Sequence, residues 1–429
     1  MKSIWEKDIT KPTFEQLRGN VKTDVLIIGG GMCGILCAYM LKHAGVDCIL
    51  VEADKICSGV TANTTAKITF QHGLIYNKIA DKYGLEVAKK YLCSQKDAME
   101  KLKELAGENF ETCNSFVYSL QNRALIEKEV DVLNKIGVKA QFCLDTELPF
   151  NIAGAVKTEN QGKIHPLKLA YSVAKDLKIY EDTRVTELKP GIAVTEKGAI
   201  TAKKTIVATH FPFINKHGWY FIKMYQHRSY VVALKNAQHF KDMYVDEADD
   251  GLSFRNYNNY LLLGGGGHRT GQSGGNWEEL MKFANKYYPE SEEAGRWATQ
   301  DCMTLDGIPY IGQYGKNTSD LYVATGFNKW GMASSMVSAM ILTDMVLGKE
   351  NQYADIYAPS RSILHPQLAI NILESAKGLI TPTVPRCPHL GCALKYNKQE
   401  HSWDCPCHGS RFDSMGKLLN NPANNDKKI

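Results

Sequence analysis

The stretch at residues 24–52, DVLIIGGGMCGILCAYMLKHAGVDCILVE, decides the fold of the first part of the chain. Residues 24–29 are an apolar run that leads into glycines, which is typical of a buried strand. Residues 32–44 then predict a helix, and residues 47–52 predict a second strand. This order indicates a β-α-β unit with a glycine-rich turn after its first strand.

The turn has the spacing Gly-x-Gly-x-x-Gly, with glycines at positions 29, 31 and 34. Gly29 permits the tight turn, Gly31 lets the backbone approach a pyrophosphate, and Gly34 lets helix and strand pack closely. The pyrophosphate would then lie at the positive N-terminus of the helix. Glu52 ends the second strand, where a carboxylate accepts hydrogen bonds from the ribose hydroxyls. Because FAD and NAD share this loop, it predicts a dinucleotide without choosing between the two.

The rest of the chain to residue 350 alternates helices and strands. Helical spacing of apolar residues predicts helices over 75–106, and short apolar runs at 203–209 and 321–325 predict further buried strands. A helix at 330–347 follows. Between 216 and 265, aromatic and β-branched residues recur, which indicates a separate sheet that covers the cofactor.

The composition excludes several classes of function. The chain has 429 residues, too many for one compact core, and we expect two or three domains. A net charge of +5 is small for this length and gives no indication of nucleic-acid binding. The first ten residues lack the apolar segment of a secretory signal, and the run at 25–28 is too short to cross a bilayer. We therefore expect a cytoplasmic protein without a transmembrane segment.

Four of the twelve cysteines crowd into two short boxes, CPHLGC at 387–392 and CPCHGS at 405–410, whereas the other eight are scattered. The boxes supply two thiols and two imidazoles as a ligand set, namely Cys387, His389, Cys405 and His408. Thiolates suit one iron of a [2Fe–2S] cluster and neutral imidazoles suit the other, as in Rieske centres. The same four ligands also suit tetrahedral zinc, so the ligand set alone leaves two metals open.

Segments spread over residues 24–347 resemble the D-amino-acid oxidase/glycine oxidase superfamily of flavoproteins. SGVTANTTAKIT (58–69) is similar to its loop along the pyrophosphate, and DTRVTEL (182–188) to its strand at the adenine. LDGIPYIG (305–312) and LYVATGFNKWGM (321–332) resemble the pair that brings a helix start to the flavin. The resemblance implies FAD, with contacts from Gly29, Gly31, Gly34, Glu52, Thr61, Thr64, Thr65, Lys67, Val185, Thr209, Asp306, Gly326, Gly331 and Met332. The chain departs from the family at His210, where glycine is usual.

The sequence offers three candidates for catalytic contact with substrate. Lys67 stands beside the predicted flavin loop and either contacts the flavin or polarises a substrate; the alternative is a surface lysine. His72 follows that loop closely and either lines the active site or is a structural histidine. Arg269 could bind a carboxylate bidentately. Arg228 and Tyr230 lie on a strand that could face the flavin, with a structural role as the alternative.

The two cysteine boxes resemble, almost residue for residue, those of Rieske proteins from respiratory and photosynthetic cytochrome complexes. This resemblance favours the [2Fe–2S] cluster over zinc. It also implies a disulfide between Cys392 and Cys407, which are not ligands in that subgroup. Few residues separate the flavoprotein segment from Cys387, so we expect a minimal module whose base packs against the flavin domain. Asn421 stands where the family has glycine before a proline.

These observations predict an α/β + β protein: a Rossmann-like FAD-binding domain of glutathione-reductase type, an interleaved antiparallel-sheet substrate domain, and a small all-β Rieske module. The expected flavoprotein spans residues 1–350. Its FAD-binding parts are about 20–75, 160–215 and 300–350, and its substrate parts are about 76–159 and 216–299. Residues 351–380 are expected to be a linker with one helix near 367–377, and 381–429 the Rieske domain.

The fusion resembles bacterial FAD-dependent oxidoreductases with a C-terminal Rieske domain. It implies an amine or amino-acid dehydrogenase whose electrons leave through the cluster to an external acceptor, such as a quinone or a ferredoxin-like carrier. One alternative is an oxygen-using amine oxidase with a structural cluster. Another is a redox-sensing or electron-transfer protein without a small substrate of its own.

Overall fold

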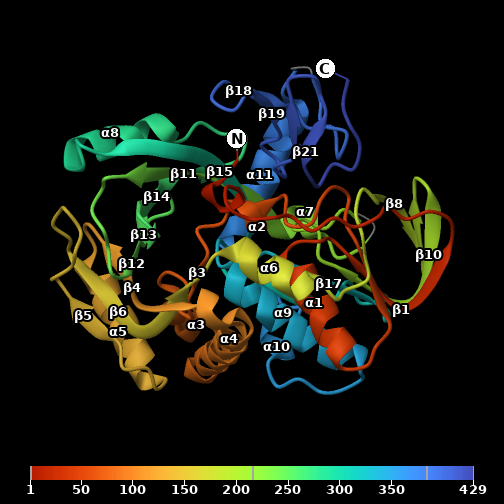
Figure 1. The fold of residues 1–429 in the computed structure, drawn as a ribbon, viewed down its shortest axis with the longest axis horizontal. Helices are drawn as coiled ribbons and strands as arrows, with labels where there is room; N and C mark the ends of the chain where they lie inside the picture. Colours follow the sequence, from red (N-terminus) through yellow and green to blue (C-terminus); the bar gives the residue numbers. More distant parts are fainter. Residues whose placement is uncertain (1, 215–216, 383–384, 429) are drawn as a thin grey trace.

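The computed structural model describes residues 2–214, 217–382 and 385–428. Figure 1 shows a body built on two large sheets, with the C-terminal module in blue above it. The expected boundary between residues 215 and 216 lies outside the described residues, and the domain limits stay predictions. Within the described residues no helix is both long enough and apolar enough to traverse a bilayer.

The first sheet belongs to the nucleotide-binding unit and is parallel at its centre. Its strands, in spatial order, are β16 (Tyr310–Gln313), β17 (Leu321–Thr325), β10 (Gly198–Val207), β1 (Val21–Ile28), β2 (Cys48–Val51) and β7 (Ile179–Tyr180). A hairpin of β8 (Val185–Lys189) and β9 (Ile192–Thr195) extends β10. The apolar run of β1 is fully buried because neighbours pair with it on both edges.

Helices cover this sheet and enclose the first core. Helix α1 (Met32–His43) begins directly after the glycine turn and packs between α6 (Pro166–Ala174) and α9 (Gly331–Val346). Helix α9 also packs on α4 (Leu85–Ala106); α4 packs on α3 (Ile75–Tyr83), and α3 packs on α5 (Arg123–Lys135). Short elements complete this part: η1 (Ile4–Glu6), α2 (Val60–Asn63), η2 (Gly107–Asn109) and α7 (Tyr220–Lys223).

The second sheet is antiparallel except where β12 and β4 run parallel. Its order is β15 (Glu292–Thr304), β11 (Met224–Lys235), β14 (Tyr260–Arg269), β13 (Ser253–Tyr257), β12 (Met243–Asp246), β4 (Glu111–Ser119), β6 (Gly154–Lys163) and β3 (Lys67–Ile68), with β5 (Gln141–Cys143) beside β6. Helix α8 (Trp277–Tyr287) packs on β11 and β14. This is the interleaved sheet that the sequence predicted.

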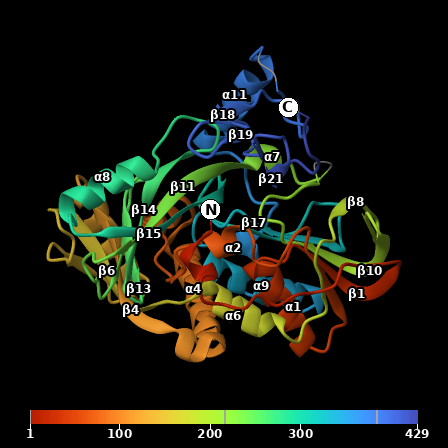
Figure 2. The ribbon, with the colours of Figure 1, turned by 45° about the horizontal axis from the view of Figure 1, so that its top comes forward.

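The C-terminal module is a four-stranded antiparallel sheet, which confirms the predicted small all-β unit. Its strands are β18 (Lys395–Asn397), β19 (Ser402–Asp404), β20 (Arg411–Asp413) and β21 (Leu418–Asn420). Two helices, α10 (Ala354–Tyr357) and α11 (Pro366–Ile380), occupy the stretch expected to be a linker. Tyr357 is fully buried in the body, so the first part of this stretch is packed structure. Figure 2 places α11 at the outer end of the molecule, beside the module.

Candidate functional site

A cavity of about 950 Å³ runs between the two sheets, and most of the predicted FAD contacts line it. These are Gly29, Gly31, Glu52, Thr61, Thr64, Thr65, Lys67, Val185, Thr209, Asp306, Gly331 and Met332. Gly34 and Gly326 are outside the lining. A Cβ atom on Gly34 would collide with the carbonyl oxygen of Gly29, so this glycine allows α1 to pack against the end of β1.

The glycine turn and Glu52 fit a dinucleotide. Gly29 has a φ of +113°, and a Cβ atom there would meet the backbone of Ala208, so only glycine suits this turn. The partly buried Glu52 carboxylate accepts hydrogen bonds from Gly30 N at 2.6 Å and from Asp54 N at 3.0 Å. Burial raises the pKa of Glu52, and these backbone donors oppose that shift. The carboxylate is therefore held by the backbone at the place where a ribose would bind.

Lys67 lies in the cavity wall with only a small part of its side chain exposed. Its ammonium donates to Thr65 Oγ1 at 3.1 Å. Burial lowers the pKa of Lys67 to about 7, and the neighbouring guanidinium of Arg255 adds to the shift. The surface-lysine alternative is therefore at odds with this position. Contact of Lys67 with flavin or substrate stays a prediction.

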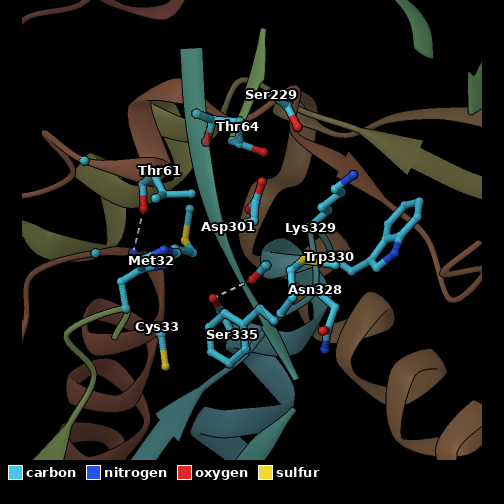
Figure 3. Close-up of a pocket in the computed structure, with 18 of the residues that line it drawn as sticks. Met32, Cys33, Thr61, Thr64, Ser229, Asp301, Asn328, Lys329, Trp330 and Ser335 are labelled. Atoms are coloured by element: carbon cyan, nitrogen blue, oxygen red, sulfur yellow. Dashed lines mark hydrogen bonds between the residues drawn. The ribbon is translucent and has the colours of Figure 1, made fainter. Parts of the chain in front are cut away.

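The structure adds two charged residues that the sequence reasoning missed. Figure 3 shows Asp301 and Lys329 in the same wall of the cavity, close to Ser229 and Trp330. Burial raises the pKa of Asp301 to about 6, which the positive charges of Lys329 and Arg228 oppose. Burial lowers the pKa of Lys329, and nearby acidic groups, Asp301 among them, oppose that shift.

Sequence signals for these two residues were weak but present. Asp301 is an acid within the long strand β15, and Lys329 lies in the segment 321–332 that the sequence analysis quoted. Lys329 has a φ of +71°, a left-handed conformation that is unusual for a lysine. Its ammonium donates to the carbonyl oxygen of Asp249 at 3.0 Å.

His72 also lines the cavity, and its ring stacks on Trp330 with centroids 5.0 Å apart. Both ring nitrogens are already engaged: Nδ1 lies 2.7 Å from Tyr91 Oη, and Nε2 lies 2.9 Å from the carbonyl oxygen of Thr69. Burial lowers the pKa of His72 to about 3, so the ring is neutral at pH 7. This arrangement supports the structural reading of His72.

The other three substrate candidates, Arg269, Arg228 and Tyr230, contact residues of the C-terminal module. The structure does not bring Arg269 into the cavity lining; its guanidinium donates to the carbonyl oxygens of Pro406 and Cys407. Arg228 forms a buried ion pair with Glu400. Tyr230 lines the cavity but its hydroxyl also donates to Glu400, at 3.3 Å. The predicted carboxylate-binding role of Arg269 therefore has no support from its position.

Asp306 lies at the cavity edge with its carboxylate paired to Arg361, at 2.8 Å from Nε and 2.9 Å from the second amino group. Burial would raise the pKa of Asp306, but the hydrogen bonds and charge of Arg361 outweigh it and the pKa is lowered. Arg361 comes from the stretch expected to be a linker. This ion pair thus ties that stretch to the wall of the cavity.

The four predicted cluster ligands converge in the C-terminal module. The centroids of the His389 and His408 rings are 4.9 Å apart, and Cys387 and Cys405 are both buried in the core of the module. The neighbouring Cys405 thiol lowers the pKa of Cys387 to about 7, against the effect of burial. Both ring nitrogens of His408 are buried without a hydrogen-bond partner, which is costly unless a metal takes one of them. The residues therefore fit an iron–sulfur cluster.

A disulfide joins Cys392 to Cys407, with Cα atoms 6.6 Å apart. The pair lies against α11, where Gly378 leaves no room for a Cβ atom beside Cys407 Sγ. The disulfide that the resemblance implied is therefore present in the structure. It links the two boxes that carry the predicted ligands.

A dinucleotide cavity and a Rieske ligand set in one chain define a redox enzyme with two cofactor centres. The chain belongs to the FAD dependent oxidoreductase family, whose family model matches residues 24–345. The Rieske [2Fe-2S] domain model matches residues 347–428. FAD and a [2Fe–2S] cluster are therefore the cofactors of this protein.

Individual relatives agree with this assignment. A protein of Bacillus subtilis, YhfW, named as a Rieske 2Fe-2S iron–sulfur protein, is 32% identical over 98% of this chain and 96% of its own length. Gamma-glutamylputrescine oxidoreductase of Escherichia coli is 22% identical, covering 79% of this chain and 87% of its own. The crystal structure of L-proline dehydrogenase from P. horikoshii superposes with a TM-score of 0.67 at 19% identity, covering 80% of this chain and 98% of that one.

Proposed function

We propose that this protein is a dehydrogenase that oxidises the C–N bond of an amine or amino acid and delivers the electrons through its cluster to an external acceptor. FAD supplies the two-electron oxidant and the cluster a one-electron carrier. The observation that carries the proposal is the cavity itself. It holds the FAD segments, the pair Asp301 and Lys329, and residues 418–421 of the cluster module.

Asp301 and Lys329 suit opposite ends of an amino acid. A carboxylate with a pKa of about 6 is ionised at pH 7 and binds the substrate ammonium. The ammonium of Lys329 binds a substrate carboxylate. Lys67, with a pKa of about 7, is partly neutral at that pH and takes the proton that an amine must lose before it is oxidised.

The names of similar proteins support the substrate class, because gamma-glutamylputrescine oxidoreductase and L-proline dehydrogenase are both oxidoreductases of amine or amino-acid compounds. A quinone or a ferredoxin-like carrier is the proposed acceptor. We propose a cytoplasmic location and no nucleic-acid partner.

The test is an anaerobic panel of amines and amino acids, followed by bleaching of the flavin absorbance and by EPR of the reduced cluster. Lys329→Gln should weaken binding of amino acids but leave simple amines unchanged, whereas Asp301→Asn should weaken both. Lys316→Gln, at an exposed lysine outside the cavity lining, is the matched control.

The alternatives give different results. Rapid peroxide formation in air without cluster reduction would favour the oxygen-using oxidase with a structural cluster. Failure of every amine and amino acid to bleach the flavin, while dithionite reduces both centres, would favour a redox-sensing or electron-transfer protein.

A further inference from the structure

Side chains of the second sheet hold the second cluster box by its backbone. Four consecutive carbonyl oxygens, at residues 406–409, each accept a hydrogen bond from the catalytic domain. The donors are Arg269 Nε to Pro406 at 3.3 Å, an Arg269 amino group to Cys407 at 3.3 Å, Gln226 Nε2 to His408 at 2.9 Å and Gln300 Nε2 to Gly409 at 2.8 Å. The second box, which carries the predicted ligands Cys405 and His408, is therefore bound to this sheet through its backbone.

Arg269 is the last residue of β14, Gln226 lies near the start of β11 and Gln300 lies within β15. The strand register brings them together, because His227 pairs with Arg269 and Arg228 pairs with Gln300. Gln226 and Gln300 are each 1% exposed and hydrogen bond to each other. Thr270 Oγ1 donates to the amide oxygen of Gln300 at 3.2 Å. Because buried amides with satisfied partners have few alternative positions, the box is held rigidly against the sheet.

Arg269 is the charged donor of the three, and it is 9% exposed. Its second amino group donates to Asn371 Oδ1 of α11 at 2.9 Å, and its guanidinium lies over the ring of Tyr225 at 4.9 Å from the centroid. Burial lowers the pKa of Arg269, while the charges of Glu374, Tyr225 and Cys405 oppose the shift. An arginine stays protonated in such a site, so a full positive charge faces the cluster box.

A positive charge at this place favours the reduced cluster. Reduction adds one electron, and a nearby cation in a poorly solvated site stabilises the added negative charge. Among the groups that oppose the pKa shift of Arg269, the carboxylate of Glu374 in α11 has the largest effect. Gln226 and Gln300 are neutral, so they position the box without shifting its charge balance.

We propose that Arg269 is a positioning residue for the second cluster box and that its charge raises the reduction potential of the cluster. This role differs from the substrate role that the sequence suggested for Arg269. It goes beyond the proposed function, since the cluster potential can be measured without any substrate.

The experiment is a redox titration of the full-length holoprotein with dithionite, followed by EPR of the reduced cluster. Arg269→Gln and Arg269→Met should lower the reduced-to-oxidised ratio at a fixed potential roughly tenfold, a shift of about 59 mV for a one-electron couple. Arg269→Lys, which keeps the positive charge, should have a reduction potential close to that of the wild-type protein. Arg296→Gln is the matched control, because this arginine of β15 pairs with Glu293 and not with the module.

Each outcome decides the proposal. Unchanged potentials in cluster-loaded Arg269→Gln and Arg269→Met would overturn it, as would an equal drop in Arg296→Gln. If both neutral variants lack iron and sulfide while Arg269→Lys is loaded, the charge is needed to hold the cluster, which supports the positioning role of Arg269. Loss of the cluster from all three Arg269 variants would show a purely structural arginine and overturn the claim about charge.

Discussion

The ion pair of Arg228 with Glu400 offers a direct test of how the module is attached to the body. Their side chains are 7% and 8% exposed, and Arg228 Nε lies 2.8 Å from Glu400 Oε1. Arg411 reaches the other carboxylate oxygen at 2.9 Å and also pairs with Asp404. Arg228→Met removes the charged partner that comes from the catalytic domain, and leaves the hydrogen bond from Tyr230 and the pairs within the module.

The size of the effect follows from the carboxyl group. Burial alone would raise the pKa of Glu400, but Arg228 and Arg411 outweigh it and lower the pKa from 4.5 to about 2. A shift of this size corresponds to about 3 kcal/mol of net stabilisation of the ionised form. Since Arg411 remains, we expect Arg228→Met to cost about 2 kcal/mol, less than the 3–5 kcal/mol for a buried pair that loses its sole partner.

The assay is urea unfolding of the holoprotein at pH 7, with the visible absorbance of the cluster as the signal of the module. The control is Arg123→Met, which breaks an exposed pair with Glu127 and should cost under about 0.5 kcal/mol. The stabilisation from Glu400 is present above about pH 4.5 and is lost as the pH falls towards 2. The difference between wild type and Arg228→Met should therefore shrink on acidification. Equal stability of the two proteins at pH 7 would refute the reasoning.

Four further predictions concern the cofactors. Glu52→Ala should weaken FAD binding by roughly 1–3 kcal/mol in a titration of the apoprotein, and unchanged affinity would show that Glu52 does not bind the ribose. Phe412→Tyr should raise the cluster potential in an EPR titration, because a tyrosine hydroxyl can donate to a cluster ligand where this buried phenylalanine cannot; the absence of a shift would mean that other factors set the potential. Mass mapping should find Cys392 and Cys407 oxidised, and two free thiols would contradict the disulfide. Anaerobically purified protein should contain iron and acid-labile sulfide, whereas stoichiometric zinc without sulfide would exclude the cluster.

Local sequence patterns were sufficient to predict features whose chemistry depends on residues that are neighbours in the chain. The glycine turn at 29–34 is one such feature, because its conformation is set by residues that lack a Cβ atom. The cysteine boxes are another, since each carries its ligands within a few residues. Both led to the cofactors that the family assignment shows.

Residue roles that depend on distant partners could not be predicted in this way. Arg269 follows the glycine run at 264–267, and the sequence suggested that it binds a substrate carboxylate. Its acceptors lie 137 and 138 residues further along the chain. Asp301 and Lys329 come from different elements, and only the packing of β15 beside the loop before α9 places them in one wall.

The spacing within short segments determined the β-α-β opening, a dinucleotide loop and a metal-ligand set. The resemblance of those segments to two known families implied FAD, the [2Fe–2S] cluster and the disulfide. The tertiary structure alone decided how the two centres are joined. The pairing of β11 with β14 and β15 brings Gln226, Arg269 and Gln300 under one cluster box. Such a site depends on strand register between segments more than 30 residues apart, and that register is set by burial of whole sheet faces rather than by any local motif.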